Sequence, residues 1–311
     1  MKQLWIIILN WNRPDLTIEC LDSLQILNSR TFKTNILIVD NGSTDDSIKK
    51  INFHIGRKLK FSKNKKASLI ETGINKGYAG GNNYGLRYAL ERGADYLMLL
   101  NNDTNVDKDF ASELIKTHIE KAAGVVCPKI YFAPGFEFKN YNKSDLGNVI
   151  WSVGGEFDWN NVYGTNRGVD QVDEGQFEKT EEVDFASGAC FLVSREVINK
   201  VGLLDENYFM YLEDVDFCHR VKLADFNLVY VPKSEIWHKV AQSSKIGSNL
   251  NDYFITRNRL LFGYRYASTK TKLALLRESI RFCINGRKWQ RIGVRDYYKK
   301  NLGKGSWKHD E

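Results

Sequence analysis

The sequence predicts an α/β protein with a mostly parallel central sheet and a helical C-terminal extension. Two continuous apolar runs, residues 4–9 and 96–100, are typical of strands that are buried on both faces of a sheet. Between them, further apolar runs alternate with segments of helical periodicity. Strands that alternate with helices are expected to be joined by right-handed crossovers, and therefore to run parallel.

The first 130 residues contain the clearest alternation. After the strand at 4–9, Pro14 suits the first turn of a helix, and an apolar stripe follows from Leu16 to Leu27. Further strands are expected at 36–39, 67–70, 96–100 and 124–129. The other helices of this part are expected after Ser47, from about 75 to 92 and from about 108 to 121.

The rest of the chain is less regular at first. Residues 133–182 are rich in Gly, Asn and aromatic residues, and we expect irregular strands and loops that cover a site, because long ordered connections are usually functional. Regular elements are expected again at 186–193 (strand), 195–201 (helix), 213–224 (helix) and 227–231 (strand). From about residue 249 onward, two or three basic, aromatic-rich helices are predicted.

Composition excludes several classes of protein. Hydrophobic residues make up 42% and charged residues 27%, which is typical of a globular protein and excludes intrinsic disorder. The run at 4–9 is too short for a signal peptide, and no run reaches membrane-spanning length, so a cytosolic protein is expected. The widely spaced cysteines are expected to be reduced thiols, mostly in the core: Cys20, Cys127, Cys190, Cys218 and Cys283.

The net charge of +7 is unevenly distributed. From Arg257 to Glu311 the chain has 15 Lys and Arg residues but only 4 Asp and Glu residues. This excess favours an anionic surface or a phosphate-bearing partner for the C-terminal part. A solvated helical face is the alternative.

Polar clusters are predicted at four places that would meet at one edge of the sheet. They are Asn10-Trp-Asn-Arg, Asp40-Asn-Gly-Ser, Asn101-Asn-Asp and the turn before Glu213, each taken to follow a strand. In an open parallel sheet, ligands bind beyond the carboxyl ends of the strands. The convergence of the four clusters therefore predicts one binding site.

Three positions in these clusters suggest chemistry, and each also has a structural explanation. Asp103 offers an oxygen ligand for a divalent cation, although Asp is also favoured in turns. Glu213 and Asp214 lie beside aromatic residues and suggest a general base, although acidic residues also stabilise helix N-termini. His238 follows an apolar strand and gains a functional interpretation only if it reaches Asp103.

The glycine-rich segment 77–85 does not have the G-x-G-x-x-G spacing of dinucleotide-binding proteins. A nicotinamide cofactor is therefore not expected. The segment can still bring its backbone close to a nucleotide.

Six motifs occur in a fixed order along the chain. They are Ile8-Leu-Asn-Trp-Asn, Val39-Asp-Asn-Gly-Ser-Thr-Asp, Asn75-Lys-Gly-Tyr-Ala-Gly-Gly-Asn-Asn, Leu99-Leu-Asn-Asn-Asp-Thr, Ser187-Gly-Ala-Cys-Phe-Leu-Val and Tyr211-Leu-Glu-Asp-Val-Asp-Phe-Cys-His-Arg. In this order they resemble the signatures of glycosyltransferase family 2, over about residues 3–265. The most similar subgroup is that of the rhamnosyltransferase-like enzymes. The resemblance implies the nucleotide-diphospho-sugar transferase (GT-A) fold.

The resemblance also implies a donor site for a UDP- or dTDP-sugar, for example dTDP-rhamnose. Asp40 would contact the uracil or thymine base, and Asn10, Asn12 and Arg13 would shape the same pocket. The other matching positions around the nucleotide-sugar are Asn75, Gly77, Asn82, Asn101 and Asn102.

On the same resemblance, Asp103 and His238 would hold Mg²⁺ or Mn²⁺ against the donor diphosphate. Asp214 would be the catalytic base, and Glu213 would orient the acceptor. The metal motif of the family commonly starts with Asp, whereas this chain has Asn101. One negative charge is therefore missing near the cation, and weaker metal binding is expected.

This resemblance also divides the chain. Residues 1–248 would form the GT-A catalytic domain, with a nucleotide-binding half at about 1–130 and an acceptor-binding half at about 131–248. Residues 249–311 would form the basic helical extension.

The implied reaction is an inverting transfer of a sugar to a hydroxyl of a glycan or lipid-linked glycan in cell-surface polysaccharide synthesis. The alternatives are a glycosidase, a nucleotidyltransferase of similar fold and a non-catalytic sugar-nucleotide-binding protein. A glycosidase has no use for a nucleotide pocket, and a nucleotidyltransferase needs a glycine-rich loop where this chain has Asn10-Trp-Asn-Arg-Pro. The pair Glu213-Asp214 disfavours a non-catalytic protein.

The extension contains an apolar stripe at helical spacing, formed by Leu273, Leu276, Ile280 and Ile284. A basic amphipathic helix can lie on the inner face of the cell membrane, where a lipid-linked acceptor would be found. The alternative is that the stripe packs on the catalytic domain or on a partner subunit in a homodimer. No nucleic-acid partner is expected, because no recognised binding module accompanies the charge.

Overall fold

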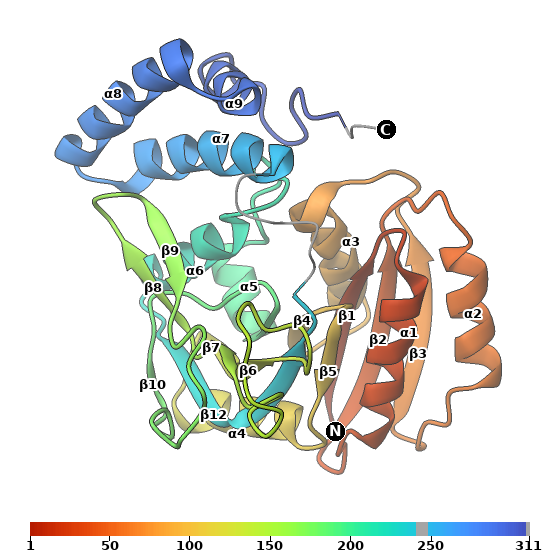
Figure 1. Cartoon of the computed structure of the whole chain (residues 1–311). Coiled ribbons are helices and arrows are strands. Elements are labelled where there is room, and N and C mark those ends of the chain that lie inside the picture. The colour runs from red at the N-terminus through yellow and green to blue at the C-terminus, as the bar shows by residue number, and fades with distance from the viewer. Residues whose placement is uncertain (241–247, 309–311) are drawn as a thin grey trace.

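The computed structural model describes residues 1–240 and 248–308 of the chain (Figure 1). A central sheet lies between two layers of helices, and three further helices stack at the end towards which the parallel strands point. This is the predicted α/β arrangement with a helical C-terminal extension.

The central sheet is mostly parallel, as predicted. Its main path runs β10, β12, β6, β11, β4, β1, β2, β3. The strands on it are β1 (Lys2–Asn10), β2 (Phe32–Asp40), β3 (Lys65–Glu71), β4 (Tyr96–Asn101), β6 (Val125–Phe132), β10 (Glu181–Glu182), β11 (Cys190–Ser194) and β12 (Leu228–His238). Strand β1 is parallel to β2 and β4, and β12 is parallel to β6, whereas β11 runs antiparallel between β4 and β6. The short strands β5 (Thr104–Val106) and β7 (Ile150–Ser152) pair antiparallel with β12 and β6.

Helices cover both faces because the central strands are apolar on both sides. In β1, Ile6 and Ile8 belong to one buried cluster and Trp5 and Ile7 to the other. The first cluster includes residues of α1 (Pro14–Ser23), the 3₁₀ turn η1 (Leu24–Ile26), α2 (Ser47–Arg57) and α4 (Phe110–Glu120). The second includes residues of α3 (Gly77–Glu91), α5 (Arg195–Val201) and α6 (Glu213–Leu223).

Two glycines explain how closely α3 approaches the sheet. A Cβ atom at Gly81 would lie 2.5 Å from Leu9 Cδ1, and one at Gly85 would lie 2.7 Å from Ile7 Cγ2. Real Cβ atoms do not approach other atoms this closely, so a larger residue at either position would overpack the core. The close packing holds the start of α3 near the carboxyl end of β1.

Residues 133–182 form short strands and loops, as expected. Besides β7 and β10 they contain a two-stranded antiparallel hairpin of β8 (Gly155–Asp158) and β9 (Tyr163–Asn166). Figure 1 shows this hairpin in front of α6 and below α7. It therefore lies next to the carboxyl end of the sheet.

Two expectations about the elements were wrong. The turn before Glu213 does not follow a strand: it follows helix α5 and the loop 202–212. The predicted strand 227–231 continues to His238, because a register shift between Val231 and Glu235 lets β12 pair with β6 again. His238 is therefore the last residue of a strand, and its side chain is fixed by the sheet.

The C-terminal part forms three helices, α7 (Asn249–Tyr266), α8 (Thr269–Asn285) and α9 (Lys288–Tyr298). Tyr253, Phe254, Trp289 and Trp307 form a buried cluster with Phe209 of the preceding part. The helices therefore share a core with the rest of the protein, and a domain boundary at 248 stays a prediction.

Two further expectations concern the membrane and the cysteines. Among the helices of the described residues, none is long and apolar enough to cross a membrane. All five cysteines are free thiols, four of them buried and Cys283 exposed, as predicted.

Candidate functional site

The carboxyl ends of β1 and β2 carry the first two polar clusters. Asn10 and Asp40 are paired in register as the last residues of these strands. Asp40 is 1% exposed, and its Oδ2 accepts hydrogen bonds from Asn10 Nδ2 (2.9 Å) and Ser43 Oγ (2.6 Å). Its Oδ1 accepts one from the Ser43 backbone N–H (2.9 Å). Asp40 therefore orders both strand ends.

A chain of hydrogen bonds extends from Asn10 to the third cluster. Thr17 Oγ1 donates to Asn10 Oδ1 (2.7 Å) and accepts from Asn102 Nδ2 (2.9 Å). Because Asn102 lies next to Asp103, the ends of β1, β2 and β4 are connected through side chains. This part of the predicted convergence is present.

Asn12 and Arg13 lie in the turn between β1 and α1. Asn12 has a left-handed backbone, with φ of 52°, and its Oδ1 accepts a hydrogen bond from the Thr44 backbone N–H (2.8 Å). The Arg13 side chain is exposed. The turn is thus fastened to the loop after β2.

The loop before α3 is fastened to the same strand ends. Asn41 Nδ2 donates to Asn75 Oδ1 (3.2 Å) and to the Gly77 carbonyl (3.1 Å). Gly77 has φ of 71°, and a Cβ there would collide with the backbone and ring of Phe209. Asn82 is buried within α3 and donates to the Tyr78 carbonyl (3.0 Å). Its side chain therefore serves its own helix in this structure.

Asp103 and His238 come from distant parts of the sequence and meet. Asp103 Oδ1 lies 3.0 Å from His238 Nε2, and both side chains are nearly buried. Burial opposes ionisation of Asp103, but His238 and then Arg13 outweigh it, so the pKa of this carboxyl lies below its ordinary value. His238 Nδ1 is buried and has no hydrogen-bond partner among the described residues.

A cavity of about 790 Å³ opens beside this pair. Its polar wall includes Asn101, His238, Glu213 and Asp214. Its aromatic lining consists of Tyr78, Phe138, Trp151, Tyr163, Phe185 and Tyr211. A mostly apolar cavity with a few convergent polar groups is the usual form of a small-molecule site. Asp40 does not line it, but the hydrogen-bonded chain through Asn10 and Thr17 leads to its edge.

Glu213 and Asp214 open helix α6 in the wall of this cavity. Asp214 Oδ2 accepts from the Gly188 backbone N–H (2.8 Å) and Oδ1 from the Val215 backbone N–H (2.8 Å). Glu213 is 5% exposed, and its Oε2 has no hydrogen-bond partner among the described residues. The two carboxyl groups are adjacent but have unlike surroundings.

Their acidities follow from this difference. Burial and the neighbouring Asp214 charge raise the pKa of Glu213 well above its ordinary value. Burial also raises the pKa of Asp214, but the backbone N–H groups of Gly188 and Val215 stabilise its carboxylate. The backbone hydrogen bonds therefore favour the charged form at Asp214, whereas burial without such bonds at Oε2 favours the neutral form at Glu213.

Two residues of the site were missed from sequence. Tyr78 lines the cavity and its hydroxyl donates to the Gly188 carbonyl. Gly188 also donates to Asp214, and a Cβ on it would lie 3.0 Å from the Tyr78 hydroxyl. Both residues are in the quoted motifs, but only the folded chain brings these motifs into contact.

The loop before the two carboxyl groups has an uncommon backbone. Phe209, Tyr211 and Leu212 have positive φ values of 64°, 67° and 70°. Such conformations cost roughly 1–3 kcal/mol for residues other than glycine and persist only where surrounding contacts enforce them. Glu213 follows directly, so these contacts also determine where the carboxyl groups lie.

The contacts come from α7, where Arg257 and Asn258 are fully buried. Asn258 Nδ2 lies within hydrogen-bond distance of the carbonyls of Tyr208 (3.0 Å), Met210 (2.8 Å) and Tyr211 (2.8 Å). Arg257 Nη2 donates to the Tyr208 carbonyl (2.9 Å). Sequence reasoning placed both residues in a basic, aromatic-rich helix and missed this role.

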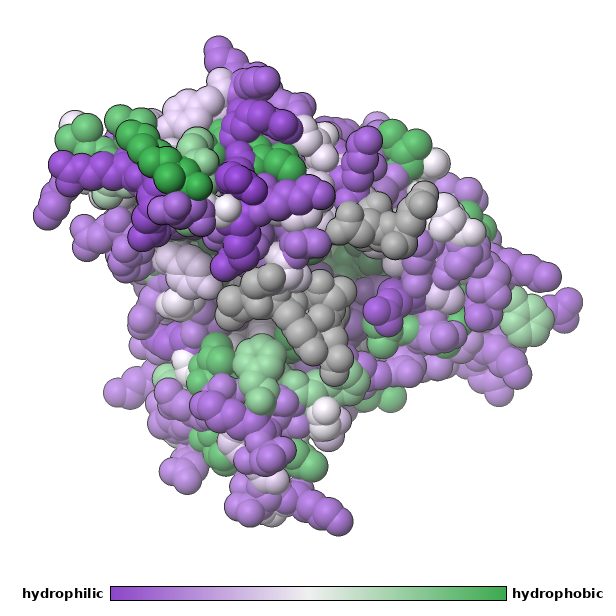
Figure 2. Space-filling view, turned by 45° about the horizontal axis from the view of Figure 1, so that its top comes forward, coloured by the Kyte–Doolittle hydropathy of each residue, from purple (hydrophilic) through white to green (hydrophobic). Residues whose placement is uncertain are grey.

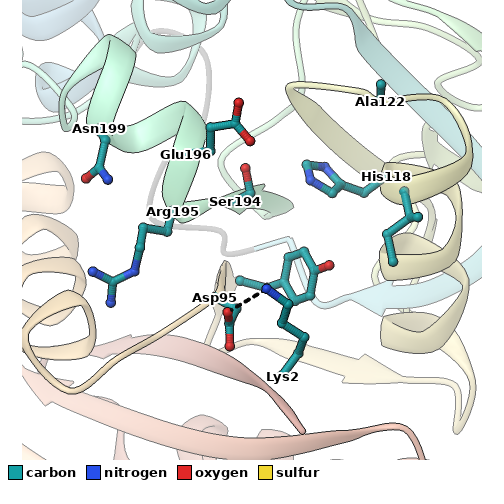
Figure 3. Close-up of a pocket in the computed structure, with 10 residues that line it drawn as sticks. Lys2, Asp95, His118, Ala122, Ser194, Arg195, Glu196 and Asn199 are labelled. Atoms are coloured by element: carbon teal, nitrogen blue, oxygen red, sulfur yellow. Dashed lines mark hydrogen bonds and ion pairs between the residues drawn. The ribbon is translucent and has the colours of Figure 1, made fainter.

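A second cavity, of about 530 Å³, lies at the amino end of the sheet between α4 and α5 (Figure 3). Three of its charged side chains are engaged in structural contacts: Lys2 pairs with Asp95 (3.0 Å), and Arg195 donates to the carbonyls of Leu90 and Ala94. Ligands of parallel sheets bind at the other end. The candidate site is therefore the cavity at the carboxyl end.

The sheet, its covering helices and the position of this site define the nucleotide-diphospho-sugar transferase (GT-A) fold. Solved structures agree. The crystal structure of GalNAc-T7 with UDP, GalNAc and Mn²⁺ matches 96% of this chain and 57% of its own, with a TM-score of 0.60 and 14% identity. The mannosyltransferase PcManGT from Pyrobaculum calidifontis, in complex with GDP-Man and Mn²⁺, matches 98% of this chain and 76% of its own, with a TM-score of 0.55 and 14% identity.

The family is also clear. The family model for "Glycosyl transferase family 2" matches residues 5–202, and the chain belongs to this family. Curated relatives include the low-salt glycan biosynthesis hexosyltransferase Agl10 of Haloferax volcanii, 28% identical over 62% of this chain and 58% of its own length. Another is the dTDP-rhamnosyl transferase RfbF of Shigella flexneri, 26% identical over 73% of this chain and 69% of its own. The predicted rhamnosyltransferase-like resemblance is confirmed, although this chain spans little more than half the length of Agl10.

Proposed function

We propose that this protein is an inverting glycosyltransferase that moves a sugar from a nucleoside-diphosphate donor to a hydroxyl group of a glycan or lipid-linked glycan. The observation on which the proposal rests is the position of Asp214 and its hydrogen bonds. Its carboxyl group accepts hydrogen bonds from two backbone N–H groups in the wall of an aromatic cavity, directly beside Glu213. Membership of the family disfavours the nucleotidyltransferase and the non-catalytic alternatives.

The donor nucleoside is proposed to bind at the ends of β1 and β2. Asp40 Oδ1 accepts a single hydrogen bond, so it keeps capacity for one further donor such as the N3–H of uracil or thymine. Asn10, Asn12 and Arg13 would surround the same base. Because Asp40 is 1% exposed, it would form the floor of this pocket. The loop 75–77, which is held by the hydrogen bonds from Asn41, would form the other side of the nucleoside pocket.

Asp103 and His238 fit a divalent cation. Among the described residues, no group of three or more His, Cys, Asp or Glu side chains is arranged to hold a metal ion. We therefore expect Asp103 and His238 to be the two protein ligands. Mg²⁺ is commonly bound in this way, with substrate phosphates and waters as the remaining ligands. The close approach of His238 Nε2 to Asp103 Oδ1 (3.0 Å) and the lowered pKa of Asp103 suit such a role. When bound, the cation would stabilise negative charge on the departing nucleoside diphosphate.

The proposed step is a single displacement. The acceptor oxygen attacks the anomeric carbon from the side opposite the diphosphate, and the bond between that carbon and the diphosphate oxygen breaks. The acceptor proton passes to Asp214. Burial raises the pKa of Asp214, which makes it a stronger base than an ordinary carboxylate. Glu213 lies beside Asp214 in the cavity wall and would orient the acceptor.

The acceptor is proposed to occupy the aromatic part of the cavity. Trp151 and Tyr163 line this part, and α7 contributes Ile255 and Arg259 to its wall. The N-acetylglucosaminyl-diphospho-decaprenol L-rhamnosyltransferase of Mycobacterium tuberculosis is 47% identical to this chain over 62 residues, which are 20% of each chain. Its name supports rhamnose as the sugar and a lipid-linked acceptor.

The substitution Asp214→Asn tests the proposal. We expect transfer to fall about 10²–10⁴-fold, because Asn cannot accept the proton, while donor binding is retained. A thermal-shift panel of UDP- and dTDP-sugars with Mn²⁺ identifies the donor. Release of nucleoside diphosphate then measures transfer, and calorimetry measures binding.

Asp184→Asn is the matched control, because Asp184 pairs with Lys222 outside the cavity. It should leave transfer unchanged. Wild-type activity in Asp214→Asn would refute the proposed base.

A further inference from the structure

Helix α8 exposes a continuous strip of aliphatic side chains. Leu273, Leu276, Ile280 and Ile284 are 53%, 40%, 54% and 69% exposed. Their spacing of three and four residues places them on one face of the helix. Figure 2 shows hydrophobic residues gathered at the upper left of the molecule, where Figure 1 has α8, bordered by hydrophilic residues.

This strip is not the face by which α8 packs on the protein. The packing face carries Thr271, Leu275 and Ser279, which are buried, and Phe282, which is partly buried. Leu275 belongs to the main core, and the Thr271 hydroxyl donates to the Trp159 carbonyl (3.2 Å). The exposed strip is therefore a second face of the helix, and among the described residues only the packing face is covered. Of the two alternatives to membrane binding, packing of the stripe on the catalytic domain is therefore excluded.

Positive charge borders the strip. Lys270, Arg277 and Arg281 are exposed along one side, and Lys272 lies on the other. Among the described residues, Lys270, Lys272 and Arg277 form no ion pair.

Within residues 249–308, no exposed acidic residue lies beside these cations. The acidic residues of 249–308 are Asp252, Glu278 and Asp296, and each is paired with an arginine and not exposed. The face of α8 is thus aliphatic in the middle and cationic at its borders.

We infer that this face of α8 binds the surface of an anionic lipid bilayer. Aliphatic side chains would enter the region between headgroups and acyl chains, and the flanking Lys and Arg would contact anionic headgroups. A second copy of the chain fits less well. A two-fold interface places the same surface on both sides, so the cationic borders of both copies would be brought together. No acidic side chain on this face would compensate for them.

The position of α8 suits a membrane-bound acceptor. Ile255 and Arg259 of α7 line the candidate cavity, and Arg259 also pairs with Glu278 of α8 (3.1 Å). One ion pair therefore links the cavity wall to the helix with the exposed strip. Binding through α8 would bring the cavity to the bilayer surface, but membrane binding itself does not depend on the proposed transfer.

Co-sedimentation with vesicles tests the inference on the full chain without any substrate. We expect binding to vesicles rich in phosphatidylglycerol at low salt, little binding to pure phosphatidylcholine, and weaker binding as salt rises. Leu276→Ser with Ile280→Ser should weaken binding about tenfold or more, because these side chains would supply the apolar contact. Lys270→Gln with Arg277→Gln should weaken binding to the anionic vesicles alone.

Phe53→Ser with Ile119→Ser is the matched control. These two side chains are 59% and 62% exposed on α2 and α4, away from α8, and their replacement should leave binding unchanged. Absence of binding to anionic vesicles at low salt would overturn the inference. So would equal losses in the strip and control variants, or a dimer in light scattering that Leu276→Ser with Ile280→Ser dissociates.

Discussion

At the scale of single residues, the decisive contrast lies between two neighbouring carboxyl groups. Glu213 and Asp214 are consecutive in sequence, and both are placed at the start of α6. Asp214 accepts two backbone hydrogen bonds, whereas Glu213 Oε2 accepts none among the described residues. An unpaired buried carboxyl group favours its neutral form, so the pair divides into one acid and one base.

This division predicts that Glu213→Gln stabilises the ligand-free protein at neutral pH. The pKa of Glu213 is raised in the folded state, so above the ordinary value of about 4.3 the unfolded chain releases a proton that the folded chain keeps. Stability therefore falls as pH rises through this range, by about 1.4 kcal/mol for each tenfold change in the dissociation constant. Gln cannot ionise and avoids this loss.

Thermal unfolding of the two proteins at about pH 4 and at neutral pH measures the effect. The advantage of Glu213→Gln should be present at neutral pH and vanish near pH 4, where Glu213 is protonated in both states. Glu120→Gln, at an exposed position on α4, should show no such difference. An equal or lower melting temperature for Glu213→Gln at neutral pH would contradict the assignment.

At the scale of elements, α7 acts on the site through the loop 207–212. Three residues of this loop have positive φ, and Asn258 and Arg257 bind its carbonyls. The helix thus holds in place a backbone that would otherwise relax. Because α6 begins where the loop ends, the positions of Glu213 and Asp214 depend on a helix that follows them by more than thirty residues.

We therefore predict that Asn258→Ala lowers the turnover number at least tenfold while donor affinity stays unchanged. Loss of the amide leaves buried carbonyls unpaired, which should also cost about 1–3 kcal/mol of stability. Steady-state kinetics, measured well below the melting temperature, separates the two effects.

Ser279→Ala is the control for a general loss of stability. Its buried hydroxyl donates to the Leu275 carbonyl (2.8 Å) of the same helix and does not touch the loop. It should lower the melting temperature without changing turnover. Unchanged turnover in Asn258→Ala, or the same reduction in both variants, would show that the contact does not position the carboxyl groups.

At the scale of the whole molecule, the candidate cavity lies where distant parts of the chain meet. Asn101 ends β4, His238 ends β12, Asp214 opens α6, and Ile255 comes from α7. A ligand that contacts several of these elements binds only the folded state and therefore stabilises it.

We predict that a nucleoside diphosphate and Mn²⁺ together raise the melting temperature more than the sum of their separate effects. Saturation at about a hundred times the dissociation constant corresponds to roughly 2.7 kcal/mol. Asp103→Asn should remove this cooperativity, because it removes the charged ligand of the proposed cation site. Glu120→Gln should retain it. Equal stabilisation of Asp103→Asn and the wild type would contradict a metal role for Asp103.

Much of the fold and several elements of the site could be predicted from sequence because they follow from local patterns. Buried parallel strands need continuous apolar runs, and those at 4–9 and 96–100 became β1 and β4. Asn10, Asp40 and Asn101 stand at strand ends, and parallel strands bring such ends to the same edge. The predicted meeting of Asp103 with His238 needed only that β5 and β12 be neighbours, which they are.

The sequence by itself determined the order of strands and helices, the family and the polar residues at the strand ends, since these depend on periodicity and short motifs. Tertiary structure decided which carboxyl group of the pair is hydrogen-bonded, which face of α8 stays exposed and that Arg257 and Asn258 are buried. These properties depend on burial and on partners far away in the chain. A pattern of residue types does not specify which distant residues come into contact in the folded chain.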